Sequence, residues 1–269
     1  MNLDTLVGLL QLIPVQRAII ALAIAGGAFP IVGVWIIGLN IVPVRFAMMH
    51  VALLGIALGM LIQLEPTLVG LLLCGVTGVL LAPLAKRPAG LSGPMGLVMT
   101  MAIAAALLVL SLSGVNANGA FELLWGSILA TRTIDVVILA IVATIIIVVY
   151  VVKKRDLALL LYDREVALCS GIAVEQLTML LMFVIAVAIG AAVHLTGALL
   201  VDSVTILPAI AARNFGRSLQ HMVWWAVGIG IVGNLLGFGL TLVLNQPPGP
   251  LLVITVGLIT LATFLRKRA

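Results

Sequence analysis

One histidine lies inside an apolar run that is long enough to cross a lipid bilayer. His50 stands in VRFAMMHVALLGIALGML, residues 44–61, about two helical turns into the run. A neutral imidazole can ligate a divalent metal or relay a proton. The alternative is a histidine that bonds a backbone carbonyl in a helix contact, and position in the chain does not separate the two.

A second ionisable residue, Asp202, lies in GALLVDSVTILPAIAARNF, residues 197–215. Ionisable groups at membrane depth are costly and mark a pathway or a paired site. A carboxylate there needs a metal ion, a histidine or water beside it. The alternative is a re-entrant segment in which Asp202 is hydrated. His194 and Asn245 are further candidates near the ends of apolar runs, where solvated positions are the alternative.

The composition indicates which elements hold these residues. Of 269 residues, 64% are hydrophobic and 9% are charged, whereas a soluble domain has roughly 25% charged residues. In lipid, backbone polar groups must be satisfied within their own segment, so each span is a helix. We therefore predict an all-α polytopic membrane protein with a single transmembrane domain over residues 1–269.

The charged residues leave apolar intervals of about 20 residues, the length that a spanning helix needs. These intervals predict a bundle of eight or nine spans. The uncertain one, 197–213, is short and contains Asp202 and Pro208, so it is either a half-helix or a re-entrant piece. The other spans are 18–40, 44–63, 66–84, 93–113, 133–152, 174–194, 220–244 and 248–265.

Basic residues gather at one set of span ends, which the positive-inside rule assigns to the cytoplasm. They include Lys153, Lys154 and Arg155 and the C-terminal cluster 266–268. The polar stretch 153–175 follows the fifth span, and it is either a short helix at the cytoplasmic face or an ordinary loop. The net charge of +5 is explained by these helix ends and does not indicate nucleic acid binding.

The sequence contains no motif for catalysis or nucleotide binding. It has no nucleophile elbow, no phosphate-binding glycine loop, no His-Glu-x-x-His and no span with two carboxylates. We expect that the chain is not an enzyme and binds no cofactor, and that any ATP is hydrolysed by another chain. A secondary transporter that uses His50 and Asp202 as a proton relay is an alternative that needs no ATPase.

Several stretches, taken in order, resemble the permease subunits of the ABC importers for zinc, manganese and iron, the ABC-3 family. The resemblance covers nearly the whole chain. The stretches are MMHVALLGIALGMLI (48–62), LLWGSILATRTIDVVILA (123–140), LLLYDREVALCSGI (159–172), HLTGALLVDSVTILPAIAARNF (194–215) and, more weakly, LNQPPGPLLVI (244–254).

The resemblance implies a multi-pass permease in the cell membrane, surrounded by lipid. Two permeases, identical or different, would form the membrane core, and a cytoplasmic ATPase would dock on each. Contact with the ATPase would fall on the polar stretch 153–175 as the coupling segment, at Tyr162, Asp163 and Glu165. An extracytoplasmic binding protein would deliver a divalent metal, with His50 and Asp202 as ligands and His194 and Asn245 along the substrate pathway.

Three positions depart from the family pattern. The family has an aspartate four residues before the histidine, on the same helical face, and here that residue is Phe46. The family aspartate of the last motif is Asn245, while Asp202 stands where a small or apolar residue is usual. Either Asp202 replaces a lost ligand, or the cargo is a metal chelate or a small organic cofactor instead of a free metal ion.

Overall fold

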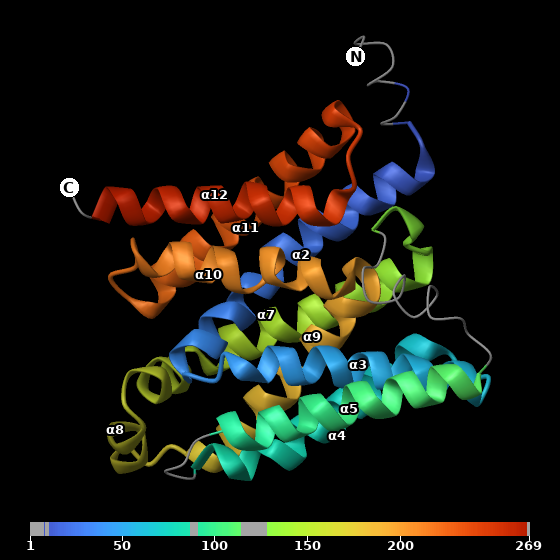
Figure 1. Cartoon of the computed structure of the whole chain (residues 1–269). Coiled ribbons are helices and arrows are strands. Elements are labelled where there is room, and N and C mark those ends of the chain that lie inside the picture. Colours follow the sequence, from blue (N-terminus) through green and yellow to red (C-terminus); the bar gives the residue numbers. More distant parts are fainter. Residues whose placement is uncertain (1–7, 9–10, 87–90, 114–127, 268–269) are drawn as a thin grey trace. The chain divides into compact units, whose positions relative to one another are not determined.

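The computed structural model describes residues 8, 11–86, 91–113 and 128–267, which form helices and turns but no strand (Figure 1). In these ranges eight helices are long and apolar enough to cross a membrane. The prediction of an all-α polytopic membrane protein is confirmed. The elements are α2 (Ile13–Gly38), α3 (Pro43–Leu61), α4 (Pro66–Leu81), η1 (Ala82–Lys86), α5 (Ser92–Leu112), η2 (Ile128–Ala130), α7 (Thr133–Tyr162), α8 (Arg164–Cys169), α9 (Val174–Val204), α10 (Ile206–Arg213), α11 (Leu219–Leu244) and α12 (Pro248–Lys267).

The described residues divide into two units, each built from segments far apart in sequence. The first unit draws on Met1–Val34, Trp125–Thr144 and Leu195–Ala269. The second draws on Trp35–Leu124 and Ile145–His194. Helices α2, α7 and α9 each contribute residues to both units.

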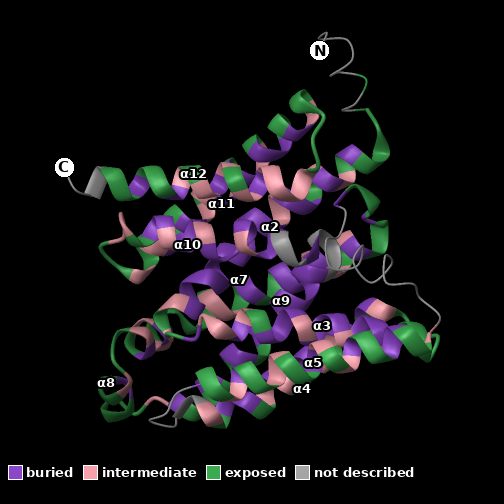
Figure 2. Cartoon of the chain, in the orientation of Figure 1, coloured by how far each residue is buried: buried purple, intermediate pink, exposed green. Residues whose placement is uncertain are grey.

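In the second unit, α3 packs against α4 and α5 (Figure 1). Glycine makes the first contact close: a Cβ on Gly55 would lie 2.5 Å from the Cα of Gly70. Small residues let helix backbones approach where lipid supplies no hydrophobic drive between helices. On its outer side α4 presents a stripe at four-residue spacing that is suited to contact lipid (Figure 2), formed by Leu68, Leu72, Val76 and Leu80.

The first unit packs α10, α11 and α12 against one another. Helix α2, which belongs to this unit as far as Val34, joins them through two glycines. A Cβ on Gly26 would lie 2.8 Å from the carbonyl oxygen of Gly230 on α11, and a Cβ on Gly33 would overlap the carbonyl oxygen of Thr205. The backbone of α2 therefore runs directly against the break between α9 and α10.

The predicted span 197–213 is not a single helix. Gly197, at φ 75° and ψ 166°, interrupts α9, and Thr205 separates the end of α9 from α10. Pro208 has no N–H to donate to the carbonyl four residues earlier, which favours a break at this point. The segment consists of two short helical pieces, and it is absent from the eight helices that satisfy the length and hydropathy of a span.

The fifth span is longer than predicted. Helix α7 continues through Lys153–Arg155 and ends at Tyr162, so half of the polar stretch 153–175 extends the span. Lysine and arginine are good helix formers, and the ammonium of Lys153 pairs with the carboxylate of Asp156 at 3.3 Å. The remainder contains the predicted short helix, α8, which has only six residues.

Candidate functional site

His50 lies on α3 and is half-buried. Its Nδ1 lies 2.7 Å from the carbonyl oxygen of Phe46, one helical turn earlier. Because a carbonyl oxygen only accepts, the neutral ring carries its proton on Nδ1 and presents the lone pair of Nε2. A histidine oriented in this way is prepared to ligate a metal or accept a proton through Nε2.

The position one turn before His50 offers no second ligand. The Phe46 side chain is 39% exposed, and the guanidinium carbon of Arg45 lies 4.2 Å from the centroid of its ring. This is cation–π geometry. The face where the family has a carboxylate therefore carries an aromatic ring beneath a cation.

Asp202 is half-buried and lies between the two breaks, in the short helical piece that follows Gly197. Its neighbour Ser203 is fully buried. A broken helix leaves carbonyl groups without their usual donors, and at membrane depth other groups must satisfy them.

Polar side chains from α11 and α12 contact carbonyl groups of this segment. The Nδ2 of Asn234 lies 3.2 Å from the carbonyl oxygen of Ser203 and 2.7 Å from that of Gly230. The hydroxyl oxygen of Thr260 lies 3.1 Å from the carbonyl oxygen of Leu207 and 2.8 Å from that of Val256 on its own helix. The broken segment that holds Asp202 is thus fixed by side chains from two other helices.

Asn234 also holds an unused acceptor. It is fully buried, and its Oδ1 accepts no hydrogen bond from any residue that the structure describes. The orientation of the amide is determined, because two carbonyl oxygens face one end and only an NH₂ group can donate to both. The sequence signal available for Asn234 is an amide in the middle of an apolar run.

His50 belongs to the second unit and Asp202 to the first. Among the described residues, no three His, Cys, Asp or Glu side chains form a group that could hold a metal ion. The backbone of His194 continues α9, but its side chain lies outside the described part. The roles of these residues along a pathway stay predictions.

Asn245 ends α11 in the left-handed conformation, at φ 52° and ψ 45°, and is exposed. Asparagine is one of the few residues that adopt this conformation readily at a helix C-terminus. The geometry accounts for Asn245 as a cap, and a role in the pathway is still a prediction.

The stretch predicted to couple to an ATPase has a defined local structure around α8. Asp163 is the N-cap of α8, and its Oδ1 accepts from the backbone N–H of Glu165 at 2.8 Å and of Val166 at 3.2 Å. Gly171, at φ 76°, ends α8 with hydrogen bonds from its own N–H to Leu168 and from the N–H of Ile172 to Ala167. This is the Schellman arrangement, in which glycine relieves the strain of positive φ.

The outer surface of α8 and of the residue before Asp163 is both apolar and acidic. Tyr162 is 86% exposed, and Val166 and Leu168 are also exposed. Glu165 is exposed beside them. This surface can contact another protein through aromatic, aliphatic and carboxylate groups together.

Fold and site define the class: a multi-pass α-helical protein of the cell membrane. One unit contains a broken helix, and the other contains the short capped helix α8 between α7 and α9, here called the elbow. The family model of the ABC 3 transport family matches residues 11–267. The chain belongs to this family of transport permeases, and the resemblance read from its sequence motifs is confirmed.

Individual relatives and a solved structure agree with that placement. The chain is 25% identical over 221 residues to the high-affinity zinc uptake system membrane protein ZnuB of Haemophilus influenzae, covering 81% of this chain and 85% of the relative. It is 24% identical to the manganese import system permease protein ScaB of Streptococcus gordonii, covering 93% and 90%. The solved structure of PsaBC from Streptococcus pneumoniae in complex with Fab matches with a TM-score of 0.85 at 22% identity, covering 98% and 95%.

Proposed function

We propose that this chain is the membrane-spanning subunit of an ATP-binding-cassette importer that translocates a divalent transition metal, namely zinc, manganese or iron. The observation that carries the proposal is the family match over residues 11–267, together with relatives named for zinc and manganese uptake. The whole chain would act as one permease domain. An extracytoplasmic binding protein would deliver the cargo, and two permease chains, identical or different, would enclose the pathway.

His50 and Asp202 are the proposed ligands of the passing metal. The bond from Nδ1 of His50 to the Phe46 carbonyl leaves Nε2 available, and a carboxylate in the bilayer needs a cation or water beside it. One imidazole and one carboxylate per chain are fewer than the four ligands that zinc prefers in a structural site. A sparse site suits transport, because the ion must leave again.

ATP hydrolysis is assigned to a separate ATPase that contacts the α8 elbow. The exposed Tyr162 and Glu165 supply contact groups, while Asp163 holds the first turn of α8 in place. Hydrogen bonds cap this six-residue helix at both ends, and it connects α7 to α9.

The test is reconstitution of the chain with its ATPase and binding protein in proteoliposomes. We expect the binding protein loaded with zinc or manganese to stimulate ATP hydrolysis and uptake of that metal. His50→Ala and Asp202→Ala should lower uptake while the complex remains assembled, and His221→Ala, which alters a histidine outside both candidate sites, should not. Failure to associate with an ATPase, or to stimulate one, would rule the proposal out.

A second cargo class is favoured by one specific observation. Where the family has a carboxylate one turn before the histidine, Phe46 lies under the Arg45 guanidinium. An aromatic ring and a cation suit an organic or chelated anion better than a bare cation. Profiling the cognate binding protein with free metals and with metal chelates separates the two, because only the chelate importer would require the chelator.

A further inference from the structure

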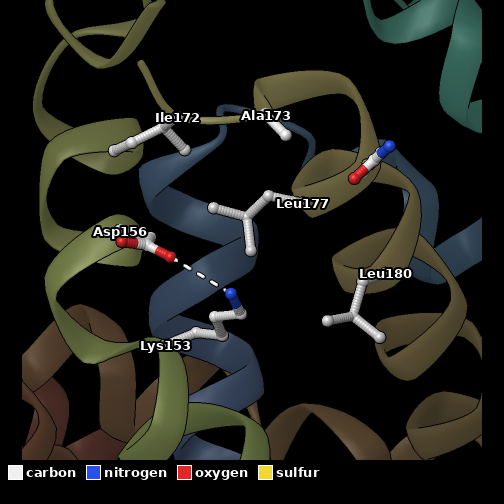
Figure 3. A pocket seen from close by; sticks show the side chains of 7 residues that line it. Lys153, Asp156, Ile172, Ala173, Leu177 and Leu180 are labelled. Carbon is white, nitrogen blue, oxygen red and sulfur yellow. Dashed lines mark hydrogen bonds and ion pairs between the residues drawn. The ribbon is translucent and has the colours of Figure 1, made fainter. Parts of the chain in front are cut away.

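A cavity of about 220 Å³ lies between the end of α7 and the start of α9 (Figure 3). Lys153 and Asp156 line it from α7, and Leu177 and Leu180 face them from α9. Ile172, Ala173 and Gln176 complete the lining. The cavity therefore combines a cation, a carboxylate and an amide with an aliphatic wall.

A second hollow of about 310 Å³ adjoins the first, since both are lined by Gln176 and Leu180. Its remaining lining is apolar: Val79 of α4, and Met179 and Phe183 of α9. Together the two hollows form one groove, here called the elbow groove, with a polar end at Lys153 and an apolar end at Val79.

The apolar end of the groove lies beside the C-terminal turns of α4, which contribute Val79 to its lining. Deeper in the unit α4 and α9 touch: a Cβ on Gly75 would lie 2.7 Å from the Phe183 ring, and one on Gly78 would lie 2.7 Å from the Met182 carbonyl oxygen. Helix α4 ends at Leu81, and the chain continues directly as the short 3-10 helix η1 (Ala82–Lys86), which contains Pro83. Met179 and Leu180, which line the groove with Val79, are 41% and 36% exposed.

The depth of the groove matches that of a lipid at the membrane surface. The apolar run of α7 ends at Val152, and Lys153 is the first charged residue of this helix after Asp135. The polar end therefore lies at headgroup level and the apolar end at acyl-chain level, on the side that the positive-inside rule assigns to the cytoplasm.

The charges at the polar end balance each other. Lys153 and Asp156 pair at 3.3 Å while their side chains are 45% and 38% exposed. Such an exposed ion pair is weak, so Lys153 and Asp156 can each pair with a charged group of a ligand instead. An ammonium offers a partner to a phosphate, and the carboxylate beside it offers a partner to an amine.

We propose that the elbow groove binds one phosphatidylethanolamine of the cytoplasmic leaflet. Its phosphate pairs with Lys153, its amine with Asp156, and an acyl chain lies along Val79, Met179 and Phe183. The inference goes beyond the proposed function, because it requires only that the chain is inserted in a membrane. A lipid at this place fills the space between the end of α7 and the start of α9, the two helices that α8 connects.

The test is native mass spectrometry of the purified full-length protein with added dioleoyl phosphatidylethanolamine, phosphatidylglycerol or phosphatidylcholine. We expect the wild type to retain one phosphatidylethanolamine in preference to the other two lipids. Lys153→Gln should lower retention roughly fivefold, and Asp156→Asn should remove the preference for the amine. The control Lys154→Gln, which alters a neighbouring exposed lysine outside the lining, should retain lipid like the wild type.

A second pair of variants tests the apolar end. Val79→Trp should fill the groove and abolish retention, while Val76→Trp, one turn earlier on the lipid-facing stripe of α4, should not. Equal retention of all three lipids by the wild type overturns the proposal, and so does equal loss in Lys153→Gln and Lys154→Gln. A preference for phosphatidylglycerol overturns the role of Asp156 as a partner for an amine.

Discussion

The side-chain amide of Asn234 on α11 donates to the backbone carbonyl of Ser203, the residue next to Asp202, at 3.2 Å. The two residues are 31 positions apart in sequence, and both are fully buried. The same NH₂ group bonds the Gly230 carbonyl of its own helix. One amide therefore ties a broken helix to an intact one, directly beside the carboxylate that is proposed as a ligand of the cargo.

The first prediction tests that tie with an isosteric change. Asn234→Asp replaces the NH₂ group by an oxygen that faces two carbonyl oxygens, and we expect a loss of about 2 kcal/mol or more in the free energy of unfolding. Asn234→Ala, which removes the donor without repulsion, should lose about 1 kcal/mol, in the usual range for hydrogen bonds between helices in membranes. Thermal unfolding in detergent measures both, and an Asp variant as stable as the wild type would contradict the assigned hydrogen bonds.

The second prediction concerns the contact between α2 and the break at Thr205. Gly33→Ala places a methyl group on the Thr205 carbonyl and should destabilise the fold by roughly 1–3 kcal/mol, as overpacking does. Gly27→Ala, on the same helix, meets nothing closer than the Ile231 Cδ1 at 3.9 Å. It should be neutral or slightly stabilising, because alanine is the better helix former. If both variants melted at the same temperature, the close approach at Gly33 would be disproved.

The third prediction restores a second ligand beside His50. Phe46→Asp places a carboxylate four residues before the imidazole on the same face of α3, and i, i+4 residues are neighbours. We expect more zinc or manganese to be retained after purification than by the wild type, as measured by elemental analysis. The double variant Phe46→Asp with His50→Ala is the control, and it should lose the gain. Equal retention in both variants would show that His50 is not a ligand.

The fourth prediction separates the cap at Asp163 from any contact with the ATPase. Asp163→Ala removes the bonds to the N–H groups of Glu165 and Val166 and should destabilise α8 by about 1 kcal/mol. Asp163→Ser keeps a capping oxygen and removes the charge. If capping is what matters, the Ser variant should stimulate the ATPase like the wild type while the Ala variant should not. If both variants fail alike, the carboxylate itself contacts the partner.

Much of the fold could be predicted from the sequence because its signals are local. Hydropathy is summed along one segment and compared with one bilayer thickness, and the predicted spans 66–84 and 248–265 coincide with two of the eight helices long enough to cross. The extension of α7 past Lys153 was not predicted, because the charges that end a span need not end a helix.

The candidate site was predicted only in part. The sequence identified His50 and Asp202 as ionisable residues in apolar runs. The tautomer of His50 depends on its contact with the Phe46 carbonyl, and the position of Asp202 depends on the hydrogen bond between Asn234 and Ser203. Neither contact follows from hydropathy. Likewise, the residue type of Asn245 does not show whether it is a helix cap or a residue of the pathway.

By itself, the sequence determined that the chain lies in the membrane, where most helices begin and end, and to which family the chain belongs. Only the tertiary structure decided which glycine breaks a helix. Gly27 and Gly197 both lie in apolar runs, yet α2 passes through the first as a regular helix and α9 breaks at the second. A break at membrane depth is stable only where other helices donate to the freed carbonyls. The carbonyls of Ser203 and Leu207, on either side of the second break at Thr205, have such contacts from Asn234 and Thr260, which are 31 and 53 residues away.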